Sequence, residues 1–216
     1  EEYKKNMPIN QCKTCRQQGQ KLFLKGDKCF SPKCVFVKRA YPPGPKGKRR
    51  RRQLSEYGRE LREKQGLKKW YNLREQQFKN YVKKILQKRG QNLQDPAVLL
   101  IRVLEKRLDN IVFRLGFAKS RAQARQMVSH GYFMVNGKPT KIPSFQLKKN
   151  DILQVRVQKT QRTMLQNLKP LLKKQKPPVW LELDAEKMEG KVIGEPTLEE
   201  AAPPAEIPTI FEFYSR

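Results

Sequence analysis

The sequence predicts an α+β protein in which helices come first and a small antiparallel sheet follows them. Apolar residues recur at helical spacing between residues 55 and 130, whereas after Gly131 they alternate with a period of two. All four cysteines of this 216-residue chain lie in its first 45 residues. We therefore divide the chain into an N-terminal arm (1–45), a mainly helical domain (46–104 with 169–216) and a small module of two helices packed on a short antiparallel sheet (105–168).

The cysteines of the arm form two close pairs. Cys12 and Cys15 are separated by two residues, thirteen residues follow, and then Cys29 and Cys34 are separated by four. Two such pairs joined by a loop can bring four thiolates around one zinc ion, and a site closed by four protein ligands has a structural role. The spacing therefore predicts a metal-stapled arm. An iron–sulfur cluster uses the same ligands, and two disulfides or unused thiols are the alternatives to a metal.

Four segments have the apolar spacing of helices, and their ends carry matching signals. They span residues 55–71, 73–89, 97–115 and 121–130. Ser55 and Ser120 are suited to cap the helices that follow them, and Pro96 fits an early helical position. Gly116 and Gly131 follow the last two segments and favour helix termination.

Three later segments have the alternating pattern of strands. Residues 132–135 are predicted to form one strand, and Asn136-Gly137 after it is a strong hairpin-turn signal. Residues 153–157 alternate apolar and polar side chains, which is typical of a strand buried on one face. Residues 179–183 show the same half-buried pattern nearer the C-terminus.

The charge balance of the chain requires an anionic partner. The chain has 48 Lys and Arg against 20 Asp and Glu, which gives a net charge of +28 and a pI near 10.2. Nucleic acid is the first candidate, because phosphate contacts release counterions and so drive binding, and an anionic membrane surface is the second. No segment is apolar enough to span a bilayer, and residues 1–5 do not resemble a secretory signal. We therefore expect a nucleic-acid partner and an intracellular location.

A basic run connects the arm to the helical domain. Its cations are Lys46, Lys48, Arg49, Arg50, Arg51 and Arg52. Such a block repels itself unless phosphates neutralise it, so we predict that it contacts RNA. A solvated or targeting segment is the alternative.

The small module carries a group of polar and basic residues on its two predicted helices. Two arginine pairs, seven and four residues apart, each share one helix face. Lys119, Ser120 and Gln123 lie at or near the start of the second helix, where backbone N–H groups favour the binding of phosphate. Although each arginine alone could simply solvate its helix, together they predict a surface for folded RNA. The predicted contacts are Arg107, Arg114, Lys119, Ser120, Arg121, Gln123 and Arg125.

Several stretches of the chain match one known family. They are Arg107-Leu108-Asp109-Asn110, Arg114-Leu115-Gly116-Phe117-Ala118, Ser120-Arg121-Ala122-Gln123-Ala124-Arg125-Gln126, His130-Gly131 and Val135-Asn136-Gly137. The cysteine spacing followed by Tyr41-Pro42-Pro43-Gly44, and the stretch Glu212-Phe213-Tyr214-Ser215-Arg216, belong to the same match. Together they resemble the S-four family of small-subunit ribosomal proteins. Pro45-Lys46 and Tyr132 depart from its pattern, and the acidic segment near 195–208 looks specific to one lineage.

The resemblance implies a structural protein without enzyme activity. Such a protein binds 16S ribosomal RNA, nucleates assembly of the subunit body and contributes to translational accuracy. The resemblance also implies a cytoplasmic location in the small ribosomal subunit and the neighbouring S-five protein as a partner, with no membrane and no small-molecule substrate. His130, Asn136 and Lys138, which lie within or beside the matching stretch, join the expected RNA contacts.

Two other classes of protein compete with this interpretation. An RNA-modifying enzyme such as a pseudouridine synthase needs a separate catalytic domain, and residues 169–216 are too few to build one. His130, the only histidine, lacks the neighbours that mark a catalytic histidine. A zinc-dependent DNA-binding regulator needs base-edge chemistry on its recognition helix, and equal affinity for duplex DNA and structured ribosomal RNA would favour it.

Overall fold

The computed structural model describes residues 11–44, 53–87, 95–156, 158, 165 and 168–215. It divides into two compact units, Glu1–Glu75 with Pro204–Arg216 and Gln76–Pro203. These boundaries differ from the predicted division at residues 45, 104 and 168. The strands near residue 180 explain part of the difference, because they belong to the sheet of the second unit rather than to a helical domain.

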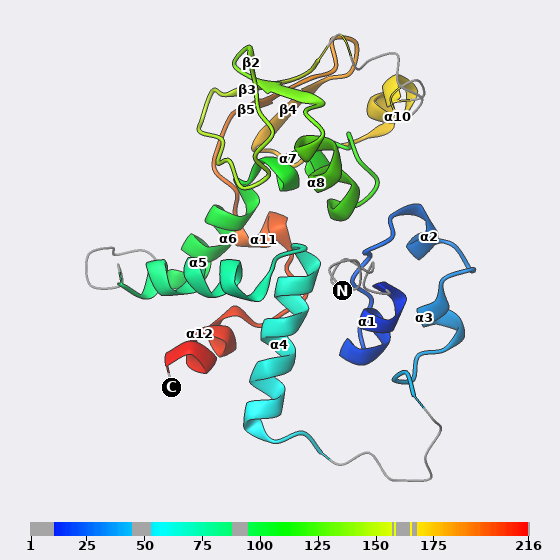
Figure 1. Cartoon of the computed structure of the whole chain (residues 1–216), viewed down its shortest axis with the longest axis vertical. Helices are drawn as coiled ribbons and strands as arrows, with labels where there is room; N and C mark the ends of the chain where they lie inside the picture. Colours follow the sequence, from blue (N-terminus) through cyan, green and yellow to red (C-terminus); the bar gives the residue numbers. More distant parts are fainter. Residues whose placement is uncertain are drawn as a thin grey trace, which may run out of the picture. The chain divides into compact units, whose positions relative to one another are not determined.

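The first unit consists of helices. They are α1 (Gln11–Gln18), α2 (Asp27–Phe30), α3 (Val35–Lys38), α4 (Glu56–Trp70) and α12 (Ile207–Ser215) (Figure 1). Ser55 caps α4 as predicted, since its hydroxyl accepts a hydrogen bond from the Gly58 N–H at 3.2 Å. Helix α12 packs along α4, where the rings of Tyr57 and Phe213 lie 5.5 Å apart.

An ion-pair cluster holds the end of α12 to this unit. The Lys64 and Lys68 ammonium groups, both on buried side chains of α4, donate to the Glu75 carboxylate at 2.7 and 2.6 Å. The Tyr214 hydroxyl donates to the same carboxylate at 3.0 Å. The Lys64 ammonium also lies 4.2 Å from the centre of the Phe213 ring. One carboxylate therefore pairs with two buried cations and anchors the C-terminal helix.

This cluster predicts a loss of stability in acid. Burial raises the pKa of Glu75, but the hydrogen bonds from Lys64 and Lys68 outweigh it and hold the pKa at about 2, against 4.5 for an ordinary glutamate. Because the folded pKa is the lower one, the stabilisation is complete above pH 4.5 and is lost as the pH falls towards 2. Urea denaturation at several pH values should show this slope, and Glu75→Gln should reduce it. Glu212→Gln, at an exposed position of α12, should leave it unchanged.

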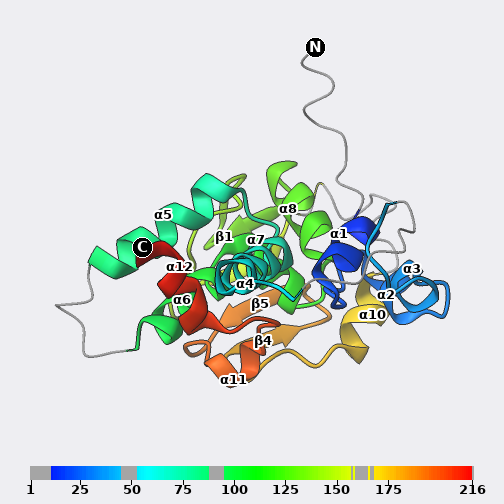
Figure 2. The same ribbon diagram turned by 90° about the horizontal axis from the view of Figure 1, so that it is seen from below.

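The second unit places helices beside a sheet. Its helices include α5 (Glu75–Gln87), α6 (Pro96–Glu105), α7 (Leu108–Arg114), α8 (Arg121–Ser129), α10 (Leu168–Lys174) and α11 (Leu198–Ala201). Figure 2 shows helix α8, then α7, and then strands β5 (Glu189–Val192) and β4 (Leu181–Asp184) in turn. Asp95 caps α6 by accepting the Ala97 N–H at 2.9 Å, with Pro96 in the first helical position as predicted. Ser120 caps α8, again as predicted.

The predicted single helix over 97–115 is wrong, because the chain breaks between α6 and α7. Arg107 forms an isolated antiparallel bridge with Gln146. On either side of it, the Leu108 N–H donates to the Phe145 carbonyl at 2.8 Å and the Leu147 N–H donates to the Lys106 carbonyl at 3.0 Å. These long-range bonds replace helical ones, so Arg107 and Arg114 do not share the face of one continuous helix.

The small antiparallel sheet is confirmed, and it is larger than the predicted module. Its strands are β1 (Phe133–Val135), β2 (Lys138–Pro139), β3 (Ile152–Val155), β4 (Leu181–Asp184) and β5 (Glu189–Val192), in the order β2-β1-β3-β5-β4. Each neighbouring pair is antiparallel. Asn136 and Gly137 join β1 to β2 with φ angles of 49° and 76°, as the turn signal predicted. Val157, within the predicted strand over 153–157, lies outside the described residues.

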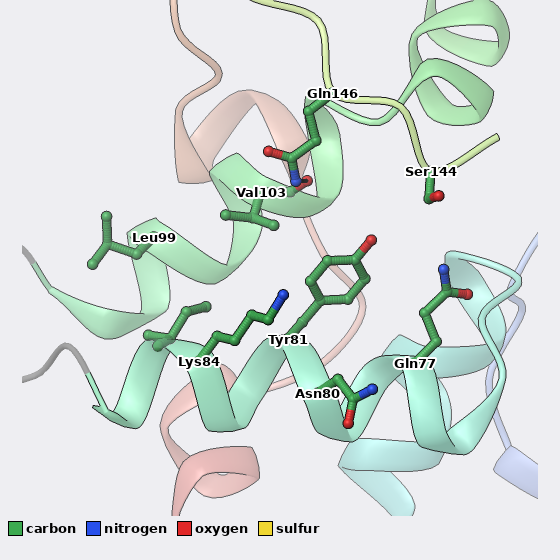
Figure 3. A pocket seen from close by; sticks show the side chains of 9 residues that line it. Gln77, Asn80, Tyr81, Lys84, Leu99, Val103, Ser144 and Gln146 are labelled. Carbon is green, nitrogen blue, oxygen red and sulfur yellow. Dashed lines mark hydrogen bonds between the residues drawn. The ribbon is translucent and has the colours of Figure 1, made fainter. Parts of the chain in front are cut away.

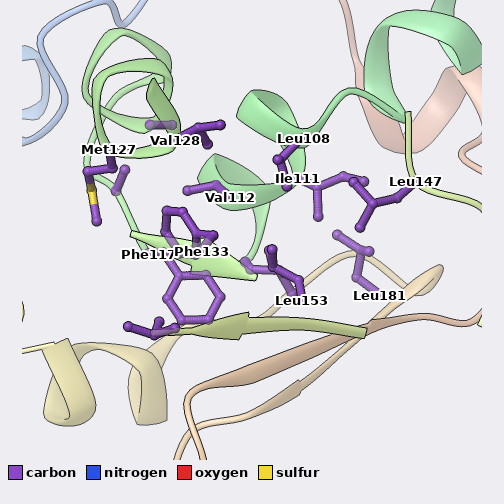
Figure 4. Packing of buried hydrophobic residues seen from close by; sticks show 14 of the residues in the cluster. Leu108, Ile111, Val112, Phe117, Met127, Val128, Phe133, Leu147, Leu153 and Leu181 are labelled. Carbon is purple, nitrogen blue, oxygen red and sulfur yellow. The ribbon is translucent and has the colours of Figure 1, made fainter. Parts of the chain in front are cut away.

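The core of the second unit lies between the sheet and helices α7 and α8. Leu108, Ile111 and Val112 of α7 point towards the strands (Figure 4). Phe117 and Phe133 meet edge to face, with ring centres 5.6 Å apart. The arginines and polar residues of α8 are therefore carried by a helix whose inner face is fixed in a packed core.

One glycine sets how closely β5 approaches α7. A Cβ atom at Gly190 would overlap the Leu115 side chain, which is completely buried. We expect Gly190→Ala to lower the free energy of unfolding by about 1–3 kcal/mol through overpacking, measured by chemical denaturation. Gly194→Ala is the matched control, because its Cβ would meet Trp180 at an ordinary 3.5 Å. Equal effects of the two substitutions would contradict this explanation.

Candidate nucleic-acid interface

The start of α8 is held by reciprocal hydrogen bonds. The Ser120 hydroxyl accepts from the Gln123 N–H at 3.3 Å, and the Gln123 side-chain oxygen accepts from the Lys119 N–H at 3.0 Å. The pattern differs from a capping box in one respect, because Gln123 accepts from the N–H of Lys119 rather than from that of the cap residue Ser120. Ser120 and Gln123 therefore shape the helix end, while Lys119 beside them is exposed.

The two arginines of α8 are anchored to α7. Arg121 donates from Nε to the Asn110 side-chain oxygen at 2.8 Å, and its guanidinium lies 4.5 Å from the centre of the Phe113 ring. Arg125 lies 3.6 Å from the Asp109 carboxylate, and its side chain is 30% exposed. Arg125 thus presents part of its charge at the surface from a fixed position, whereas the Nη2 atom of Arg121 is buried.

Arg107 and Arg114, which we predicted as RNA contacts, are directed into the protein. Arg107 is 1% exposed, and its guanidinium binds both oxygens of Asp109 at 3.1 and 2.7 Å and the Tyr81 hydroxyl at 2.7 Å. Arg114 is 18% exposed and binds both oxygens of the buried Glu105 at 2.9 and 2.8 Å. The helix break at residues 106–107 turns Arg107 inward. In this structure both residues position the helices that carry the surface.

The remaining predicted contacts differ in their surroundings. His130 ends α8 and is exposed, and Lys138 on β2 is also exposed. Asn136 uses its amide to close the hairpin, donating to Asp151 at 2.8 Å and accepting from the Ile152 N–H at 2.9 Å. The basic run, Lys46 to Arg52, lies outside the described residues.

The residues that sequence reasoning missed are the acidic and polar partners of the arginines. Asn110 connects Arg121 to the Glu105 carboxylate that binds Arg114, since its amide donates to Glu105 at 2.6 Å and its oxygen accepts from Arg121. Asp109 serves Arg107 and Arg125 together. A signal was present in the chain, because Asp109 and Asn110 follow directly after Arg107 and interrupt an apolar stripe with two polar residues that end up buried.

The four cysteines lie around one small cavity of the arm. Cys12, Cys15, Cys29 and Cys34 all line it, and all but Cys12 are buried. All four are free thiols, and the Lys25 N–H donates to the Cys29 sulfur at 3.3 Å. Burial raises the pKa of Cys15, and its three neighbouring thiols raise it further. Within the part of the chain that the structure describes, no three Cys, His, Asp or Glu side chains stand in a metal-binding arrangement.

Comparison with known proteins assigns the chain to a family. The model of the ribosomal protein S4/S9 N-terminal domain matches residues 9–105, and that of the S4 domain matches residues 106–153. The protein named small ribosomal subunit protein uS4 from Syntrophomonas wolfei is 46% identical over 95% of this chain and 96% of its own length. The protein of that name from Thermotoga petrophila is 44% identical over the same shares. This chain belongs to the uS4 family of small-subunit ribosomal proteins.

The boundary between the two family matches falls between Glu105 and Lys106, so Glu105 belongs to the first match and its partner Arg114 to the S4 domain. In this uS4 chain the S4 domain begins at the break between α6 and α7, and it contains Arg107, Asp109 and all of α8. The match ends in β3, so β4 and β5 extend the sheet beyond it. No helix among the described residues of this uS4 protein is both long and apolar enough to cross a membrane.

Proposed function

We propose that this chain is a primary 16S rRNA-binding protein of the small ribosomal subunit, that it nucleates assembly of the subunit body and that it contributes to translational accuracy. It is a structural constituent of the ribosome and no enzyme. The observation that carries the proposal is the set of basic side chains that the S4 domain holds on or beside helix α8 and on strand β2. There Lys119 is exposed at the start of α8, Arg121 and Arg125 are fixed against α7, and Lys138 projects from β2. RNA phosphates suit such a surface because neutralising them releases counterions.

Salt dependence tests the RNA contacts one by one. We expect Lys119→Gln and Lys138→Gln each to reduce the slope of log affinity for 16S rRNA against log salt by about 0.7–0.9. Neutralising the six cations of residues 46–52 should remove roughly 4–5 units of that slope. Lys187→Gln is the control, because this exposed lysine lies among acidic residues in the β4–β5 turn. Unchanged slopes at both test lysines, or equal affinity of the chain for duplex DNA, would contradict the proposal.

A structural zinc ion in the arm is the second part of the proposal. Cys12, Cys15, Cys29 and Cys34 already share one cavity, and thiolates are the ligands that a closed structural zinc site uses. The Lys25 N–H that donates to the Cys29 sulfur would help to orient this ligand. Elemental analysis of the purified chain should find one zinc per chain. A visible absorption band would instead assign an iron–sulfur cluster, and the absence of any metal would refute both.

A neighbouring ribosomal protein of the S-five family completes the proposal. The resemblance of the chain to its family supports this partner, since an accuracy role was expected at the interface of the two proteins. Chemical crosslinking of assembled small subunits followed by mass spectrometry tests it. Crosslinks from this chain to other proteins but none to the S-five protein would refute this assignment.

A further inference from the structure

A cavity lined by both polar and apolar side chains lies between α5 and α6 of the second unit. Its volume is about 610 Å³, which falls within the range of about 300–1,000 Å³ typical of small-ligand sites. Gln77, Asn80, Tyr81 and Lys84 line it from α5, and Leu99 and Val103 line it from α6 (Figure 3). All lining residues belong to one compact unit, so one folded body builds the cavity.

The hydrogen-bonding groups of the cavity point to a ligand with both donors and acceptors. Arg107 donates to the Tyr81 oxygen at 2.7 Å, and because a guanidinium can only donate, the Tyr81 O–H keeps its hydrogen for another acceptor. Gln146 donates from its amide to the Val103 carbonyl at 3.4 Å, which leaves its side-chain oxygen as an acceptor. Figure 3 shows Tyr81 rising from α5 towards Gln146. A donor and an acceptor therefore face the same space.

The remaining walls add apolar area and one positive charge. Leu99, Val103 and Ile85 supply apolar surface, and the Tyr81 ring supplies an aromatic one. Lys84, which is exposed, lies at the cavity and also points from α5 towards α6 in Figure 3. Among the described residues that line the cavity, Lys84 is the one cation and none is a carboxylate. The cavity thus suits a flat polar ring to which a negatively charged group is attached, and it does not suit a basic peptide.

We propose that this cavity binds a single unstacked nucleotide of the RNA that the chain binds. The base would lie against Tyr81 and the apolar wall with its edge towards the Tyr81 hydroxyl and Gln146, and Lys84 would contact its phosphate. Proteins that read RNA by sequence do so mainly at unstacked bases of this kind, and stacking on an aromatic side chain tolerates any base. The inference rests on the proposed rRNA-binding function and adds a site where a base, rather than the backbone alone, is held.

Filling the cavity tests the proposal on the full chain bound to 16S rRNA. Val103→Trp, which places a large ring in the cavity from its apolar wall, should weaken rRNA binding about tenfold or more, because it displaces a base that stacks on an aromatic side chain. Its salt slope should fall by no more than the single Lys84 contact, about 0.7–0.9, because the phosphate contacts elsewhere remain. Ultraviolet crosslinking should join one nucleotide to the peptide that contains Tyr81, and this crosslink should be absent in Val103→Trp. An equally tight complex with an unchanged RNA footprint would overturn the proposal.

Three further variants guard against misfolding and test the charge. Gln146→Ala removes an exposed amide, leaves the backbone bridge to Arg107 intact and should weaken binding severalfold even if Val103→Trp fails to fold. Lys84→Gln should lower the salt slope by about 0.7–0.9, whereas Lys83→Gln, exposed on the same helix but outside the cavity, should weaken binding less. Equal effects of the two lysine variants together with an inert Gln146→Ala would refute the nucleotide site.

The controls separate this inference from the function on which it rests. Failure of the wild-type chain to bind 16S rRNA would refute both. If the wild-type chain binds 16S rRNA and the cavity variants bind it equally well, only the nucleotide site is refuted. This result is expected if the cavity receives a side chain of a neighbouring protein. Adenosine and uridine monophosphates, titrated while the Tyr81 resonances are followed, distinguish a free nucleotide: saturation by them, with no crosslink in the rRNA complex, would also overturn the proposal.

Discussion

Replacing Asp109 with alanine is expected to lower the free energy of unfolding of the Gln76–Pro203 unit by about 3–5 kcal/mol. The substitution leaves the Arg107 guanidinium 1% exposed without the carboxylate that binds two of its nitrogens, and an uncompensated buried charge is costly. It also removes the partner of Arg125 on α8. Urea denaturation followed by circular dichroism measures the loss, and rRNA affinity should fall with it because α8 loses its anchor.

A double substitution distinguishes the lost pair from a lost packing contact. Arg107→Met combined with Asp109→Leu removes both charges while filling a similar volume, and such replacements are often close to neutral. The double variant should therefore be more stable than Asp109→Ala alone. If the two were equally unstable, the damage would come from the shape of the site and the ion pair would not be its cause.

Replacing Cys15 with serine is expected to abolish metal binding by the arm. A structural zinc site contributes about 10–16 kcal/mol of apparent binding energy, and a serine hydroxyl does not supply the fourth thiolate. Metal content should fall from one ion per chain to none, and residues 11–44 should become sensitive to limited proteolysis. The Gln76–Pro203 unit should keep its own thermal transition, since its core contains no residue of the arm.

Gln17→Ala provides the matched control for that substitution. Gln17 lies on α1 two residues after Cys15, and its side chain is exposed. Its replacement should change neither the metal content nor the proteolysis pattern. Digestion of the arm that is the same in wild type, Cys15→Ser and chelator-treated protein would show that the cysteines do not hold a stabilising metal.

The features that the sequence predicted correctly are those fixed by neighbouring residues. Ser55 and Ser120 cap the helices that follow them, and Asn136-Gly137 forms the predicted turn, because each depends on backbone groups within three residues. The family was expected from a resemblance of several stretches, and the comparisons confirmed it. Local chemistry was sufficient for the caps and the turn.

The features that it missed depend on partners far along the chain. The break before α7 exists because Arg107 pairs with Gln146, and no local pattern near residue 106 encodes that bridge. The inward direction of Arg114 follows from Glu105, which is nine residues away and on another helix. Strand β5 joins β3 across more than thirty residues, so the predicted boundary at residue 168 cut through one sheet. A basic side chain near a predicted interface could not be assigned to surface or interior before these contacts were known.

The attachment of α12 to α4 has a consequence for synthesis of the chain. The first unit is built from two segments with the whole of the second unit between them. A chain that grows from its N-terminus exposes Lys64 and Lys68 of α4 long before Phe213 and Tyr214 exist to cover them. The second unit can therefore fold before α12, which completes the first unit, has been synthesised. For this protein the order of completion is the reverse of the order of the sequence: the part that starts first is finished last.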